Sequence, residues 1–108
     1  MQTLKPAEIV HTGEKLVEEW LNENGFINVI NNTGEGGSNA IEANGSIENI
    51  LVHVRAHIQP FRPGRVNEED RNKIKATAEG LSRKAYVAYV VIDIDKNIVG
   101  EISWERLS

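Results

Sequence analysis

The chain has 108 residues, 40% of them hydrophobic, and its formal net charge at pH 7 is −4. This length suits one domain, residues 1–108, with a single core of modest stability. Because the sequence contains no cysteine, disulfides, zinc–thiolate sites and cysteine nucleophiles are excluded. No apolar run approaches the roughly 20 residues of a membrane-crossing helix, and no signal-peptide pattern opens the chain. We therefore expect a cytoplasmic protein with no membrane partner.

Charge is unevenly distributed along the chain. Residues 1–52 carry a net −6 and residues 85–108 a net −2, whereas residues 53–84 hold eight Lys/Arg against four acidic residues, a net +4. The acidic total argues against strong nonspecific binding to nucleic acid. The basic middle third still allows a local phosphate-binding surface, although for Arg71, Lys73 and Lys75 we favour ordinary solvated helix charge.

The first predicted element is a helix over residues 6–23. Pro6 suits its first turn, Asn24-Gly25 suits its end, and Thr12 offers a second place where it could begin. Gly13 weakens an isolated helix by about 1 kcal/mol relative to alanine. The helix is predicted because apolar residues recur at helical spacing, at Ile9, Leu16, Val17, Trp20 and Leu21.

Strands are predicted at residues 26–30, 40–43 and 49–58. Residues 31–39 consist of turn-forming types and predict a loop. Asn44-Gly45 is typical of a hairpin turn. In the third strand, Ile50, Val52, Val54, Ala56 and Ile58 share one face and leave Leu51, His53, Arg55 and His57 on the other. This polar face is the main candidate for chemistry.

A rigid basic loop, residues 59–65, leads to a second helix capped by Asn67. A continuous apolar strand over residues 86–92 indicates burial on both faces. A last strand is predicted at about residues 98–104. The order α-β-β-β-α-β-β predicts an α/β domain in which a helix covers each side of a mixed sheet.

Several short motifs resemble those of the restriction-endonuclease-like, or PD-(D/E)xK, superfamily, above all the Holliday-junction resolvases and Mrr-type enzymes. Gly13-Glu14 with Asn24-Gly25-Phe26 resembles the family's first helix, which carries a glutamate. Residues 36–43, Gly-Gly-Ser-Asn-Ala-Ile-Glu-Ala, resemble its Gly-x-x-Asp-Ile-Ile-Ala strand, and residues 50–55, Ile-Leu-Val-His-Val-Arg, resemble Ile-Leu-Val-Glu-Val-Lys. The resemblance covers roughly residues 9–92. It implies a three-layer core of order αβββαβ, with an added C-terminal strand.

The resemblance also implies where catalytic residues would stand, and those residues differ. The family's aspartate falls at Ala40, or at Asn39 if the register moves by one residue, its glutamate at His53 and its lysine at Arg55. Ala40 offers no metal ligand, and the nitrogen of His53 suits zinc or other transition metals better than Mg²⁺. The Arg55 guanidinium can stabilise negative charge but cannot serve as a base.

A replacement metal site is one alternative. Glu42 points to the same strand face as Ala40, and Glu14 of the first helix could approach that face. Glu42, Glu14 and His53 would then hold Mg²⁺ or Mn²⁺. We favour the other alternative, in which Glu42 pairs with Arg55 or another cation across the sheet. No cofactor is expected unless the replacement site is active. His53 and His57 stand about 13 Å apart along the strand and cannot share a metal.

The basic loop offers further contacts. Phe61 either stacks on a base or anchors the loop, with Arg62 and Arg65 on phosphates. The glycine loop, residues 34–37, would lie beside this surface. Trp104 is expected to cover a sheet edge or to form a dimer contact.

Three hypotheses for function follow. The leading one is a nuclease-fold protein without metal-dependent cleavage, which binds DNA or RNA, or a partner, through His53, Arg55, His57, Arg62 and Arg65. The second is an active metal-dependent endonuclease that uses Glu42 with Glu14 or His53, assisted by Arg55. The third is a structural homodimer with no nucleic-acid role.

Overall fold

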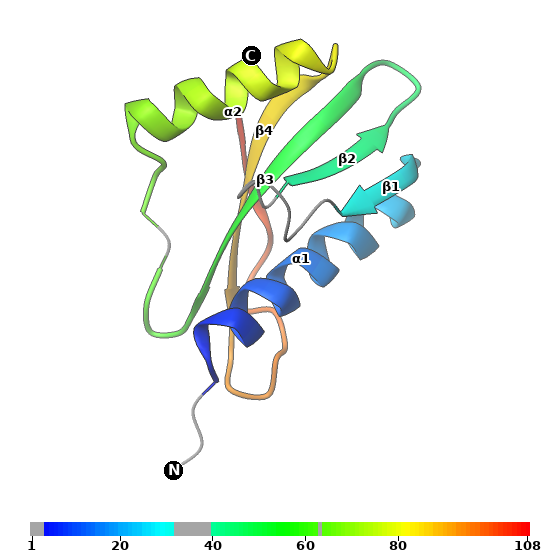
Figure 1. The fold of residues 1–108 in the computed structure, drawn as a ribbon. Coiled ribbons are helices and arrows are strands. Elements are labelled where there is room, and N and C mark those ends of the chain that lie inside the picture. The colour runs from blue at the N-terminus through cyan, green and yellow to red at the C-terminus, as the bar shows by residue number, and fades with distance from the viewer. Residues whose placement is uncertain (1–3, 32–39, 63) are drawn as a thin grey trace.

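The computed structural model describes residues 4–31, 40–62 and 64–108 (Figure 1). These residues form two helices and five strands. In chain order the elements are α1 (Pro6–Glu23), β1 (Ile27–Asn31), β2 (Ala40–Asn44), β3 (Asn49–Ile58), α2 (Glu68–Gly80), β4 (Lys84–Ile92) and β5 (Ser103–Arg106). Neither helix is both long and apolar enough to span a membrane.

The five strands form one mixed sheet in the order β1-β2-β3-β4-β5. The β1–β2, β2–β3 and β4–β5 pairs are antiparallel, and β3 and β4 are parallel. A parallel pair needs a long crossover connection, which here contains α2. The chain is therefore an α/β domain with a five-stranded mixed sheet, as its sequence predicts.

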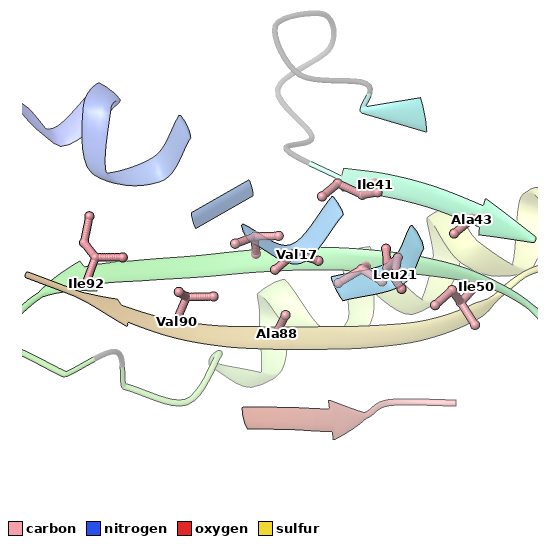
Figure 2. Packing of buried hydrophobic residues seen from close by; sticks show 10 residues of the cluster. Val17, Leu21, Ile41, Ala43, Ile50, Ala88, Val90 and Ile92 are labelled. Atoms are coloured by element: carbon pink, nitrogen blue, oxygen red, sulfur yellow. The ribbon is translucent and has the colours of Figure 1, made fainter. Parts of the chain in front are cut away.

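Helix α1 covers the more apolar face of the sheet. Figure 2 shows Val17 and Leu21 of α1 beside side chains of β2, β3 and β4, and all of these residues belong to one buried cluster. Burying such side chains stabilises the fold by about 1.5–3 kcal/mol each. The buried cluster consists of Val17, Leu21, Ile41, Ala43, Ile50, Val52, Val54, Ala88, Val90 and Ile92.

Helix α2 covers only part of the opposite face. Its buried Ala78 packs in a smaller cluster with Ala40, Leu51 and Ala85. Because side chains alternate along a strand, His53, Arg55 and His57 lie on the same face of β3 as Leu51. Each of these three residues is partly exposed. The polar half of β3 thus lies on the α2 side of the sheet.

Gly13 permits α1 to lie close to the sheet. A Cβ atom at Gly13 would stand 2.5 Å from the Cβ of Ala56 on β3, so the glycine is required by packing. The helix is continuous from Pro6, and it does not begin again at Thr12.

The last part of the chain differs most from the prediction. Residues 98–104 were expected to form a strand, but Ile98 makes only an isolated bridge to Ile92, and β5 begins at Ser103. Gly100 has a φ of 78°, a left-handed conformation that interrupts the extended chain between the bridge and β5. Two smaller differences are that β1 lies one residue later than predicted and β4 begins two residues earlier.

Candidate functional site

The polar face of β3 is flanked by two neighbouring strands. His53 lies opposite Ala40 of β2, and on the other side Arg55 pairs with Tyr89 and His57 with Val91 of β4. These side chains form a partly exposed row along the α2 side of the sheet. We call His53, Arg55 and His57 the polar strip.

The three members of the polar strip differ in charge. Burial lowers the pKa of His53 below its ordinary value, and the nearby positive charge of Arg55 lowers it further, while Asp70 opposes both effects. His53 is therefore mostly uncharged at neutral pH. Arg55 keeps its charge, and it forms no ion pair or hydrogen bond with any of the residues that the structure describes. The buried Nδ1 of His57 has no hydrogen-bond partner in the same part of the chain.

The connection between β3 and α2, which we call the arm, is described at residues 59–62 and 64–67, and these residues lie beside the polar strip. Its anchor is Val66, which is buried and whose backbone N–H donates to the Tyr89 hydroxyl at 3.4 Å. Phe61 was considered either a base-stacking residue or an anchor, and it is 66% exposed, so it does not anchor the arm. Arg62 is exposed and has no charged partner among residues 4–31, 40–62 and 64–108.

Glu105 of β5 holds the arm, α2 and β4 together. Its carboxylate accepts hydrogen bonds from Tyr89 at 2.7 Å, from Arg71 at 2.9 Å and from Arg65. These bonds, the Tyr89 hydroxyl first, lower the pKa of Glu105 to about 2. Arg65 was expected to contact phosphate, but it is already paired with Glu105. Arg71 was expected to be ordinary solvated helix charge and likewise pairs with Glu105.

Sequence reasoning missed Glu105 as a site residue. The signal available was strand alternation, which places Glu105 on the face opposite Trp104. Alternation cannot show that Arg65 and Arg71, 40 and 34 residues away, converge on this carboxylate.

A hollow of about 500 Å³ lies between the arm and the β4–β5 edge on this face. Tyr89, the neighbour of Arg55, is one of its walls, and both arginines of the arm reach it. The lining residues are Arg62, Arg65, Tyr89, Val91, Val99, Gly100, Glu101 and Ser103. The hollow combines two arginines, one tyrosine ring and the carboxylate of Glu101, and it is open to solvent.

Glu42 is held by a cation other than Arg55. Its carboxylate lies 3.0 Å from Arg83 Nε, and both side chains are largely buried. Arg83 also donates to the Ala43 carbonyl and to Asn44 Oδ1, each at 2.9 Å. The prediction that Glu42 pairs with a cation is therefore confirmed, and the cation is Arg83.

Glu14 lies on the α1 side of the sheet, away from Glu42. It is 3% exposed, and its buried Oε2 has no hydrogen-bond partner among the described residues. Burial raises the pKa of Glu14, because it disfavours the charged carboxylate. The structure thus does not bring Glu14, Glu42 and His53 together as a replacement metal site would need. Within the described ranges, no three His, Asp or Glu side chains are grouped to hold a metal ion.

Two expected features of the site fall on residues 32–39, outside the described residues. These are the glycine loop at 34–37 and the alternative register at Asn39. Ala40 itself is buried and faces α2.

No family model matches this chain, and no curated protein is significantly similar to it. Its function is therefore inferred from the arrangement of its own side chains.

Proposed function

We propose that this chain is a nucleic-acid-binding domain built on a restriction-endonuclease-like fold, and that it lacks the metal-dependent cleavage of that family. The element order before β5, α-β-β-β-α-β, supports the fold assignment. The two helices on opposite faces of a mixed sheet support it as well. The last strand, β5, is the added C-terminal strand of this proposal.

The strand register supports the alignment of the catalytic positions. Ala40 and His53, which stand where the family has its aspartate and glutamate, are direct partners on β2 and β3. Arg55, at the lysine position, lies two residues further along the same face. This register is what the proposal requires of the family's site, with its carboxylates replaced.

These residues do not fit the magnesium ion that the family's reaction requires. Mg²⁺ prefers carboxylate and other hard oxygen ligands in octahedral geometry. Ala40 has no ligand atom, and His53 offers nitrogen. The alternative carboxylate on this face of β2, Glu42, is paired with Arg83. We therefore derive no cleavage step through a metal at this position.

One observation carries the binding proposal: Arg55 and Arg62 lie on the α2 side of the sheet without a charged partner among the described residues. A guanidinium makes two parallel hydrogen bonds to a phosphate, and its charge persists at all physiological pH values. Tyr89 lies between the two positions, next to Arg55 in the sheet and on the wall of the hollow that Arg62 lines. The exposed Phe61 adds a ring on which a base can stack.

The charge of this surface sets the expected strength of binding. Arg65 and Arg71 share the single negative charge of Glu105 and leave one net positive charge there. Arg55 and Arg62 are the two cations of this surface with no charged partner among the described residues. Two phosphate contacts give a slope of log affinity against log salt of about −1.4 for a single strand and about −1.8 for a duplex. We expect modest, salt-sensitive binding.

The test compares wild-type protein with the double variant Arg55→Ala, Arg62→Ala on labelled single-stranded, duplex and four-way-junction DNA and on RNA. We expect affinity to fall at least tenfold and the salt slope to approach zero. The matched control, Lys75→Ala with Lys84→Ala, removes equal charge from exposed positions near the opposite end of β4 and should bind almost as wild type does. If wild type shows no salt-sensitive binding, or if the control loses as much affinity, the proposal fails.

Cleavage is scored in the same mixtures with Mg²⁺ and with Mn²⁺. We expect none from wild-type protein. Metal-dependent cleavage that disappears in Glu42→Gln would instead establish the active-nuclease alternative.

A further inference from the structure

A second groove lies on the α1 side of the sheet. Its volume is about 530 Å³, and it runs between the C-terminal half of α1 and the segment that leads into β5. Its lining residues are Leu16, Glu19, Trp20, Glu23, Ile98, Gly100, Glu101, Ile102 and Trp104. We call it the acidic groove. It shares only Gly100 and Glu101 with the hollow beside the arm.

The acidic groove has an aromatic wall. The rings of Trp20 and Trp104 pack together with centroids 4.8 Å apart and planes inclined at 46°, and both residues are partly exposed. Trp104 was expected to cover a sheet edge or to form a dimer contact, and here it contacts α1. A partly exposed tryptophan offers both apolar surface and a π face that attracts cations.

The rim of the groove carries negative charge without compensation. Glu19, Glu23 and Glu101 are exposed, and none forms an ion pair with a residue in the described part of the chain. Other carboxylates do have such partners: Glu8 pairs with Lys96, and Glu48 with Arg106. No Lys, Arg or His lines the groove.

The edge of the sheet is open beside this groove. β5 is the last strand in the sheet order and pairs only with β4 among the described strands. An extended peptide can add to such an edge through main-chain hydrogen bonds, and its alternate side chains then point to the same face. On the α1 side those side chains would meet Trp104 and the carboxylates.

We propose that the acidic groove binds an extended, basic segment of a partner protein. Lysine or arginine side chains at alternate positions of that segment pair with Glu19, Glu23 and Glu101 and lie against the two tryptophans, while its backbone extends the sheet at β5. The charge complementarity selects a cationic occupant, and the strand edge selects an extended one. The inference does not depend on nucleic-acid binding, because the polar strip lies on the opposite face of the sheet.

The two tryptophans provide a direct assay, because Trp20 and Trp104 are the only tryptophans in the chain. The probe is a nine-residue peptide that alternates lysine with valine, and the control peptide has glutamate in place of lysine. We expect the lysine peptide to change the tryptophan emission in a saturable way and the glutamate peptide to leave it unchanged. High salt should weaken the binding.

The variant that tests the site is Glu19→Gln, Glu23→Gln, Glu101→Gln, with circular dichroism to check its fold. It should bind the lysine peptide about tenfold more weakly, as expected from the loss of three exposed charge pairs. The matched control, Glu68→Gln, Glu69→Gln, Glu79→Gln, removes the same charge from exposed positions of α2 and should bind as wild type does.

Three outcomes would overturn the proposal. The emission could stay unchanged with the lysine peptide, or the groove and control variants could bind it equally well. The third is self-association that depends on protein concentration, changes the tryptophan emission and is lost in the groove variant. That result would overturn the proposal, because the occupant of the groove would then be a second copy of this chain.

Discussion

Glu105 connects the stability of the domain to its proposed binding surface. Replacing it by glutamine keeps the size of the side chain but removes the negative charge that Arg65, Arg71 and Tyr89 contact. Each hydrogen bond to a charged group contributes about 1.5–3 kcal/mol when it is shielded from water. The side chain of Arg65 is 79% exposed, so its share is strongly screened. We expect Glu105→Gln to lower the free energy of unfolding by about 1–3 kcal/mol at pH 7.

The pH dependence of this effect follows from the pKa of Glu105. Its folded-state pKa is about 2, against an ordinary value of 4.5. A carboxylate with a depressed pKa stabilises the fold above its unfolded pKa, and this contribution is lost as the pH falls toward its folded pKa. The stability difference between wild type and Glu105→Gln should therefore be constant above about pH 5 and shrink between pH 4.5 and pH 2.

Urea unfolding followed by circular dichroism at several pH values measures this difference. Glu69→Gln is the control, because Glu69 and Lys73 are exposed and 3.6 Å apart, so its effect should stay below about 0.5 kcal/mol. Nucleic-acid binding provides a second readout. Glu105→Gln frees Arg65 and Arg71 from their anion and should strengthen binding while it weakens the fold. A stability difference that is absent at pH 7, or independent of pH, would refute the reasoning.

Two further predictions concern the helices. Gly13→Ala should destabilise the domain by about 1–3 kcal/mol in thermal unfolding, because the new Cβ would lie 2.5 Å from Ala56 Cβ and this clash outweighs the better helix propensity of alanine. The control is Gly80→Ala, where a new Cβ would meet no atom within 4 Å, and it should be neutral or stabilising in the same assay. Equal losses of stability at both positions would contradict the packing argument. Asn67→Ala removes the side-chain acceptor for the Asp70 backbone N–H and should lower the free energy of unfolding, measured in urea, by about 1 kcal/mol. An unchanged urea midpoint would show that this helix cap contributes nothing to stability.

Local residue patterns predict most of the elements correctly. The spacing of Val17 and Leu21 indicates α1, and both residues are fully buried in the core. The alternation in residues 50–58 separates an apolar face from His53, Arg55 and His57, and the structure places the apolar face against α1. These patterns succeed because each depends only on the 3.6- and 2-residue periods of helix and strand.

Predictions that needed contacts between distant residues were less complete. Local pattern alone did not identify Arg83 as the partner of Glu42, Glu105 as the partner of Arg65, or Trp20 as the neighbour of Trp104. Gly13 was interpreted as a weak point in a helix, and it is a contact position against β3. In each case the deciding neighbour is at least 40 residues away in the chain.

Local residue patterns predict most of the helices and strands, with residues 98–104 as the main exception, and they identify β3 as the strand that carries polar side chains. A resemblance in short motifs also suggests that Ala40, His53 and Arg55 occupy the catalytic positions of a restriction-endonuclease-like protein, and this assignment stays a prediction. Which charges remain unpaired depends on how distant segments pack together. The tertiary structure placed Glu42 against Arg83 and Glu105 against Arg65 and Arg71, and it left Arg55 and Arg62 without such partners among the described residues. The physical reason is that periodicity depends on near neighbours along the chain, whereas ion pairing depends on separations of a few ångströms in space.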